Sequence, residues 1–516
     1  MRTVVVDGDP LTVSDVVDVA SGRARAELGG GAEARMASSR QTVAAAVERG
    51  DVVYGVTTGF GLLADTTVGR TDLERMQRAL LRSHAAGVGA PLEDRIVRAL
   101  LLLRARTLTA GYSGVRVELP RRLLELLARG LLPVVPAKGS VGASGDLAQL
   151  AHLALPLIGE GRLRRAGSAD PAGRPAAEVL AEAGLAPLVL APKEGLALLN
   201  GTEPMQALLA FAVAEAEMLV RVADVACAVA VEGLLGTDRP YDERVQRLRP
   251  HPGQLDSAAN LRALLAGSPL VASHRDSAHA VQDSYSLRCT PQVHGAVRDV
   301  LAHCRRVIDV ELGAVVDNPV ILEGPDGPEV LTSGNFHGEP LAFAADMLAI
   351  ALAELASISE RRIDRMLDPA LSRGLPPFLA PDAGTNSGYM LAQYTAAALV
   401  AENKVLAHPA SVDTIPTSGN QEDHVSMGWG GVRKLSEVVA NVRAVLSVEL
   451  LCGAATLDLR SEIAVPGPAT SAVHGVIRRS VPRMDIDREV APQIAALDAM
   501  LAELVAAAAG VTGGLR

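Results

Sequence analysis

One short string in the sequence has residue types that suit chemistry on its own backbone. Residues 138–147 read KGSVGASGDL, with a glycine at every third position from 139 to 145. Glycines at this spacing permit tight backbone approach and positive φ. Apolar residues at helical spacing follow from Leu147, so the loop abuts a helix N-terminus. Taken alone, the string fits a helix cap or an anion-binding loop. It lacks the Gly-Lys-Ser/Thr that ends a phosphate-binding Walker loop.

Five further strings rich in glycine, asparagine or polar residues lie between helical patterns. Each has an ordinary interpretation. Tyr54 is a half-buried residue beside a glycine turn, Asn200 an N-cap, and Arg288 half of a surface salt bridge. Residues 421–424 would then be a solvated polar turn. The strings are 54–61 (YGVTTGFG), 199–202 (LNGT), 282–289 (QDSYSLRC), 333–338 (SGNFHG) and 420–427 (NQEDHVSM).

Together with Ala143-Ser144-Gly145-Asp146, these strings resemble in content and order the signature of the aromatic amino acid ammonia-lyase and aminomutase family. In that family the glycine nitrogen attacks the alanine carbonyl and two waters are lost, which gives a methylidene-imidazolone (MIO). The resemblance implies that Ala143, Ser144 and Gly145 form this cofactor in place, and that no metal takes part. Ser144 supplies the hydroxyl whose loss creates the exocyclic methylene. Small residues suit this step because only glycine offers an unhindered amide nitrogen.

The resemblance also implies roles for the other strings. Tyr54 is expected as the catalytic base, which requires nearby positive potential because a tyrosine ordinarily titrates near about 10. Tyr285 belongs to the proton-relay string, and Arg288 in the same string can pair bidentately with a substrate carboxylate. The expected catalytic residues are Tyr54, Ala143, Ser144, Gly145, Tyr285 and Glu422, and the expected substrate-binding residues are His84, Asn200, Gln282, Arg288 and Phe336.

Two of these residues predict the substrate. His84 can hydrogen-bond an imidazole or equally a phenol, whereas the carboxylate of Glu422 can pair with an imidazole nitrogen. The resemblance implies Glu at this place in the histidine branch and Gln in phenylalanine enzymes. We therefore expect elimination of ammonia from L-histidine to give trans-urocanate. Glu203 and Gly419 depart from the family pattern, in which Gln and Ala are usual.

Other interpretations compete with this one. On the same scaffold, the alternative is a tyrosine or phenylalanine ammonia-lyase or aminomutase. From a different class, the alternative is a helical assembly protein without activity, and the intact Ala143-Ser144-Gly145 and Tyr54 argue against it. The fumarase and aspartase superfamily also eliminates ammonia from helical proteins, but its loop (G-S-S-x-M-P-x-K-x-N) is not in this sequence.

Long helical patterns must position these strings. Several exceed the usual length of a globular helix, and their Ala, Leu and Val faces predict long antiparallel helices packed as a bundle. The beginning of the chain predicts a strand at 3–6 and a helix capped by Ser14, and residues 320–331 predict a hairpin. The expected fold is mainly α with a smaller mixed α/β N-terminal part, in domains 1–111 and 112–516. Helical patterns run over 94–110, 203–236, 292–315, 338–367, 388–407, 431–459 and 486–508.

Composition limits the possible surroundings of the protein. The 516 residues carry a net charge of −10 with both signs mixed, which argues against nucleic-acid binding and a polybasic membrane contact. Charges interrupt the apolar stretches, which favours buried helices over membrane spans. The first residues lack a signal-peptide region, and the four cysteines form no C-x-x-C pair, so we expect a cytoplasmic protein. The apolar helix faces and the resemblance imply a homotetramer whose sites combine subunits and bind an amino acid.

Overall fold

The computed structural model describes residues 1–277 and 281–516 and is mainly helical, as the sequence predicts. The chain folds into two compact units, each made of three chain segments. Neither unit has a boundary near residue 111. The predicted division into domains 1–111 and 112–516 therefore stays a prediction. Unit 1 comprises Met1–Ala214, Arg305–Ala345 and Pro409–Arg433, and unit 2 comprises Glu215–Cys304, Asp346–His408 and Lys434–Arg516.

Unit 1 holds the strands found among the described residues, with short helices around them. β1 (Arg2–Val6) pairs in parallel with β2 (Ala24–Leu28). β8 (Val320–Gly324) pairs antiparallel with β9 (Gly327–Leu331), which confirms the predicted hairpin. The remaining strands are β3 (Val88–Pro91) paired with β5 (Pro136–Lys138), and β4 (Leu131–Pro133), β6 (Arg162–Arg165) and β7 (Arg174–Pro175) in one antiparallel sheet. The helices are α1 (Val13–Ala20), α2 (Ala32–Arg49), α3 (Leu73–His84), α4 (Asp94–Thr109), α5 (Glu118–Ala128), α6 (Leu147–Ala154), α7 (Ala176–Glu182) and α8 (Glu194–Leu199).

The first helix begins with a capping box, although not at the predicted residue. Thr12, and not Ser14, is the N-cap of α1. Its hydroxyl accepts a hydrogen bond from the Asp15 amide at 3.1 Å, and the Asp15 carboxylate accepts from the Thr12 amide at 3.0 Å. This reciprocal pair satisfies two amides that a helix start leaves without partners. Ser14 has no such partner three residues later and lies inside the first turn.

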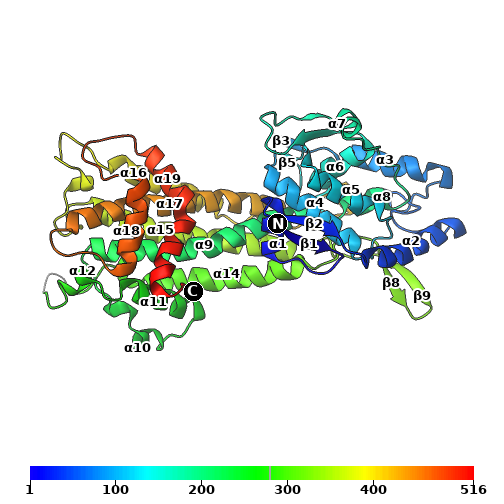
Figure 1. The fold of residues 1–516 in the computed structure, drawn as a ribbon. Helices are drawn as coiled ribbons and strands as arrows, with labels where there is room; N and C mark the ends of the chain where they lie inside the picture. The colour runs from blue at the N-terminus through cyan, green and yellow to red at the C-terminus, as the bar shows by residue number, and fades with distance from the viewer. Residues whose placement is uncertain (278–280) are drawn as a thin grey trace. The chain divides into compact units, whose positions relative to one another are not determined.

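Four long helices contribute residues to both units, and they confirm the periodicity seen in the sequence. They are α9 (Glu203–Gly233), α14 (Thr290–Glu311), α15 (Glu339–Leu367) and α17 (Gly428–Arg460). In Figure 1, α9, α15 and α17 lie side by side. Within unit 2, a fully buried ion pair joins Arg362 of α15 to Glu449 of α17, and Arg443 of α17 bonds Glu215 of α9 at 2.7 Å. The core between them is mostly leucine, alanine and valine, as the scarcity of aromatic residues requires.

Unit 2 is completed by shorter helices around this bundle. α18 (Pro468–Ser480) packs on α19 (Ala491–Thr512), which begins later than the predicted 486 and has a proline in its first turn. The predicted helix at 388–407 is confirmed as α16. These helices are α10 (Glu243–Gln246), α11 (Pro252–Leu265), α12 (Pro269–Ala272), α13 (Tyr285–Arg288), α16 (Met390–Leu406), α18 (Pro468–Ser480) and α19 (Ala491–Thr512).

Three helices of the described residues are long and apolar enough to cross a membrane, judged by length and composition alone. They are α15, α17 and α19. In the most apolar stretch of α15 and α17, 67% and 72% of the residues are buried inside the chain, but in α19 only 22% are. The apolar surface of α19 is therefore left largely without cover by its own chain.

Candidate active site

Two adjoining cavities of unit 1 collect five of the six strings singled out in the sequence. One has a volume of about 320 Å³ and the other about 410 Å³. Tyr54, Ala143, Ser144 and Glu422 line both of them, so the two form one continuous recess. Pockets of a few hundred Å³ with a few polar groups are the size that small ligands occupy.

The loop before α6 is bent sharply at the predicted tripeptide. Ser144 has φ 51° and Gly145 φ 81°, both in the left-handed region. A Cβ on Gly145 would lie 2.0 Å from the carbonyl oxygen of Gly201, so only glycine fits there. The Asp146 amide donates to the same carbonyl at 2.9 Å. The loop before α6 therefore packs directly against the 199–202 string.

Buried polar contacts brace this bend. Asp146 is fully buried and accepts hydrogen bonds from the Ser140 hydroxyl at 2.7 Å and from the Met205 amide at 3.1 Å. Met205 lies in the first turn of α9, whose positive end favours a carboxylate. Burial nevertheless raises the pKa of Asp146 to about 7. On the other side, the Met427 amide donates to the Val141 carbonyl at 3.0 Å.

The residues present fit an MIO group formed in place. Ala143 and Ser144 line both cavities, so a methylene at position 144 would face the recess. The bend brings the tripeptide backbone back on itself, as ring closure requires. The Oδ1 atom of Asn200 is buried beside this loop and has no hydrogen-bond partner among the described residues, so it is an acceptor left open to a donor in the recess.

The departure at Glu203 from the family pattern has a structural reason. Glu203 forms a fully buried ion pair with Arg104 at 3.0 Å and accepts from the Thr107 hydroxyl at 2.8 Å. Arg104 also donates to the Asn200 carbonyl at 2.7 Å, while the Asn200 Nδ2 donates to the Asn318 carbonyl at 2.8 Å. The charged pair therefore holds the backbone of Asn200. Such a pair needs both partners because removing one leaves a buried charge uncompensated.

The second departure, Gly419, lies in a tight turn at the edge of the recess. Its φ of 63° is in the left-handed region, where alanine would be strained. The neighbouring Ser418 hydroxyl accepts from the Leu62 amide at 3.2 Å. This contact ties the loop that carries Tyr54 to the segment that carries Glu422.

Tyr54 lies half-buried on its glycine loop, with its ring edge-on to Phe60 at a centroid distance of 6.4 Å. Desolvation raises its pKa, the Gly61 amide lowers it less, and the Glu422 carboxylate raises it further. The expected role as a base requires a positive potential that lowers the pKa of Tyr54, but in this structure that pKa is raised. The described residues around the phenol supply burial and a negative charge, so Tyr54 is protonated at neutral pH.

His84 and Glu422 lie in the smaller cavity, as expected of a pair that chooses the substrate. The Nδ1 atom of His84 lies 3.0 Å from both the Leu80 carbonyl oxygen and the Ser83 hydroxyl oxygen. The carbonyl can only accept, and the Ser83 hydroxyl itself donates to that carbonyl at 3.1 Å, so the contacts favour the hydrogen on Nδ1. Burial lowers the pKa of His84. The neutral ring therefore offers Nε2 as an acceptor. Oε2 of Glu422 is buried and has no hydrogen-bond partner among the residues that the structure describes.

Phe336 lines the larger cavity, and beside it lies a group that sequence reasoning missed. His337, Glu339 and His424 place one donor atom each within 4.8 Å of one another. Oε2 of Glu339 is buried without a partner. Two imidazoles and one carboxylate are a set that zinc accepts. No spacing rule links residues so far apart, although two of the strings, 333–338 and 420–427, each contain a histidine.

The three remaining predicted residues belong to unit 2 and are not among the residues that line this recess. Gln282 is exposed beside Thr237 and Asp283, in a separate small cavity of unit 2. Tyr285 is 71% exposed, and the Arg288 guanidinium lies over its ring, 4.5 Å from the centroid.

Comparisons with known proteins agree with the geometry. The family model described as aromatic amino acid lyase matches residues 11–479. The chain is 52% identical over 507 residues to a histidine ammonia-lyase of Anaeromyxobacter dehalogenans, covering 98% of this chain and 99% of that protein. It is 50% identical over 519 residues to that of Streptomyces coelicolor, covering 100% of both.

Among solved structures, the histidine ammonia-lyase of Trypanosoma cruzi matches with TM-score 0.89 and 39% identity, covering 99% of this chain and 95% of that one. The tyrosine aminomutase of Streptomyces globisporus matches with TM-score 0.92 and 39% identity, covering 100% of both chains. Match length, identity and the bent Ala143-Ser144-Gly145 loop agree, and the chain therefore belongs to the aromatic amino acid lyase family.

Proposed function

We propose that the protein eliminates ammonia from L-histidine and releases trans-urocanate. The observation that carries this proposal is that His84 and Glu422 line one cavity with Ala143 and Ser144. The imidazolium form of the substrate carries an N–H on each ring nitrogen, so one can donate to Nε2 of His84 and the other to Oε2 of Glu422, which has no hydrogen-bond partner among the described residues. The full-length relatives named histidine ammonia-lyase, about half identical to this chain, support the same substrate.

In this proposal Ala143, Ser144 and Gly145 form MIO, and no metal takes part. Once formed, MIO would supply an electrophilic carbon, through which the substrate amine would become a better leaving group. Asn200 lies beside it with an unpaired buried Oδ1. Tyr54, Phe60 and Gly61 of the loop 54–61 line the recess and would limit the access of water to a bound substrate, which would strengthen each charge interaction with it.

Tyr54 is proposed as the base that takes the β-proton. Its raised pKa means that base function needs a nearby cation, and the described residues that shift this pKa supply burial and the negative charge of Glu422 instead. We assign that cation to Arg288 of a neighbouring copy. The same guanidinium pairs with the substrate carboxylate, Tyr285 relays the proton, and Gln282 and Phe336 complete the binding set.

A homotetramer provides such a neighbour. Phe343, Met347 and Ile350 lie on one face of α15 at helical spacing and are 52%, 40% and 50% exposed. Together with the uncovered apolar surface of α19, they are a face that another copy would cover. We therefore propose a cytoplasmic homotetramer in which these helices pack between subunits, without a membrane or nucleic-acid partner.

A tyrosine aminomutase or lyase is the second candidate, and one observation favours it. Nε2 of His84 accepts a phenol hydroxyl as readily as an imidazole N–H. The tyrosine aminomutase structure matches this chain with the same identity as the histidine enzyme structure.

Separate incubations of the purified protein with L-histidine, L-tyrosine and L-phenylalanine decide between them. Formation of the unsaturated acid is followed by ultraviolet absorbance, and a β-amino acid is sought by mass spectrometry. We expect trans-urocanate as the main product, and none with Ser144→Ala. Turnover of L-tyrosine above L-histidine would overturn the substrate assignment and leave the family unchanged.

A further inference from the structure

The short helix α13 in unit 2 carries two side chains that reach solvent, Tyr285 and Arg288, on a backbone that is hydrogen-bonded to buried side chains. Tyr285 is exposed, and Arg288 is partly exposed above its ring. The Nε atom of Arg288 donates to the Asp283 carbonyl at 3.0 Å. The Asp283 carboxylate in turn accepts from the Thr237 amide at 2.7 Å and from Arg373 at 3.0 Å. Asp283, just before α13, is therefore held in place by Arg288, Thr237 and Arg373.

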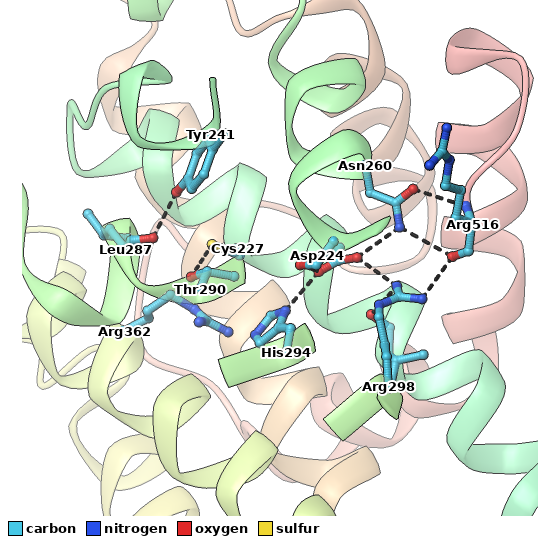
Figure 2. Close-up of polar contacts among 12 residues, drawn as sticks. Asp224, Cys227, Tyr241, Asn260, Leu287, Thr290, His294, Arg298, Arg362 and Arg516 are labelled. Atoms are coloured by element: carbon cyan, nitrogen blue, oxygen red, sulfur yellow. Dashed lines mark hydrogen bonds and ion pairs between the residues drawn. The ribbon is translucent and has the colours of Figure 1, made fainter. Parts of the chain in front are cut away.

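The end of α13 is held by buried hydroxyl groups. Helix ends leave carbonyls without backbone partners, and a four-residue helix consists almost wholly of ends. The Tyr241 hydroxyl donates to the Leu287 carbonyl at 2.8 Å, and the Thr290 hydroxyl donates to the Ser286 carbonyl at 3.1 Å. Figure 2 shows the Tyr241 ring pointing its oxygen at Leu287.

A buried ion pair supports the same turn. Nη1 of Arg362 donates to the Ser286 carbonyl at 3.3 Å, and its other nitrogens bond Glu449. Both charged side chains are fully buried. Cys227 Sγ lies 3.1 Å from the Thr290 hydroxyl oxygen (Figure 2). The carbonyls below Tyr285 and Arg288 are thus fixed by side chains from α9, α14 and α15 and from the turn before α10.

Tyr241 has a property that a purely apolar core position would not need. It is fully buried, and its one polar atom is bonded to the α13 backbone. Burial raises its pKa well above the usual range, so the hydroxyl keeps its proton and remains a donor. A buried hydroxyl is costly to desolvate, and only a hydrogen bond offsets that cost. Phenylalanine would fill the same space without that bond.

We propose that Tyr241 is a positioning residue that aims Arg288 at the substrate carboxylate through the Leu287 carbonyl. This inference rests on the proposed function, in which Arg288 binds that carboxylate. Tyr241 itself touches no substrate. Loss of its hydroxyl frees the Leu287 carbonyl, the turn relaxes, and the guanidinium no longer meets both carboxylate oxygens. Arg–carboxylate pairing is sensitive to such a shift because both parallel hydrogen bonds must form together.

The test compares two competitive ligands of the intact protein. 3-(Imidazol-4-yl)propionate carries the imidazole and the carboxylate, whereas histamine carries the imidazole and the amine but no carboxylate. In Tyr241→Phe we expect the inhibition constant of the propionate and the KM for L-histidine to rise about tenfold, the effect of one lost buried hydrogen bond with its orphaned carbonyl. We expect the inhibition constant of histamine to change less than about twofold, since it makes no carboxylate contact.

Tyr389→Phe is the matched control, because Tyr389 is equally buried and its hydroxyl has no hydrogen-bond partner. We expect it to leave all three constants unchanged. If Tyr241→Phe is insoluble, Thr290→Val removes the hydroxyl on the Ser286 carbonyl at equal volume, with Thr290→Ser as the conservative rescue.

Equal changes for both ligands, or none for either, would overturn the positioning role. Failure of the proposed function looks different, because the unaltered protein would then not turn over L-histidine. In that case the same comparison is made with the carboxylate-bearing and decarboxylated analogues of the amino acid that is turned over.

Discussion

Replacement of Glu422 by glutamine tests the substrate assignment most directly. The change keeps the size of the side chain and removes its charge. Oε2 of Glu422 is buried and has no hydrogen-bond partner among the described residues, so an N–H of a bound imidazolium ring would be its partner. His84 lies in the same cavity, and its Nε2 would accept from the N–H of the other ring nitrogen.

The size of the effect follows from the kind of hydrogen bond that is lost. A hydrogen bond to a charged group contributes roughly 1.5–3 kcal/mol, and roughly 1.4 kcal/mol is a factor of ten. We therefore expect kcat/KM for L-histidine to fall between about tenfold and about 150-fold in Glu422→Gln. Any side activity on L-tyrosine should fall less than about threefold, because a phenol needs no carboxylate partner.

The assay measures initial rates of unsaturated acid formation by ultraviolet absorbance over a range of substrate concentrations. Asp423→Asn is the control, since it removes the same charge from the adjacent, exposed residue that lines only the larger cavity. A loss for L-histidine below about threefold in Glu422→Gln would refute the pairing with imidazole. A larger loss for L-tyrosine than for L-histidine would assign the recess to the phenol.

Four further outcomes follow from the recess. Intact-mass analysis should find the unaltered protein two waters lighter than its encoded mass and Ser144→Ala at full mass; a full-mass unaltered protein would contradict the cofactor. Tyr54→Phe should bind the substrate with little change and lose most of kcat, and activity within a few-fold would reassign Tyr54 to structure. The pKa of Asp146 is raised to about 7 in the fold, so its protonated form stabilises the protein at low pH and this contribution is lost as the pH rises through 7. The thermal midpoint of the unaltered protein should therefore fall relative to that of Asp146→Asn between about pH 4 and pH 8, and a constant difference would contradict the raised pKa. Dialysis against a chelator should leave activity unchanged. A loss of activity that added zinc restores in the unaltered protein, but not in His424→Ala, would make His337, Glu339 and His424 a metal site.

Much of the fold was accessible from the sequence because helical periodicity is a local property. The long patterns around 338–367 and 431–459 became α15 and α17 almost residue for residue. Helix caps were less accessible, since Thr12 and Ser14 are both good N-cap residues and only the partner Asp15 decides between them.

The sequence allowed the site residues to be predicted, but not all of their contacts and charges. Ala143, Ser144, Tyr54 and Glu422 do meet in one recess, as the resemblance implies. The direction of the pKa of Tyr54 was not accessible, because it depends on burial and on a carboxylate far along the chain. The ion-pair partner of Glu203 could not be predicted either, because Arg104 lies 99 residues away in the sequence.

The brace on the bent loop has a consequence for the order of events during synthesis. The loop at 138–146 leaves the ribosome early, but the Met427 amide that holds the Val141 carbonyl is translated almost three hundred residues later. Met205 in the first turn of α9 supplies only the other half of the support. A nascent chain that ends before Met427 therefore carries the Ala-Ser-Gly sequence without the complete clamp on its bend. If the tripeptide forms MIO as proposed, this maturation belongs to the last stage of folding, when the third segment of unit 1 docks. A chain interrupted upstream of that segment would remain chemically immature as well as incompletely folded.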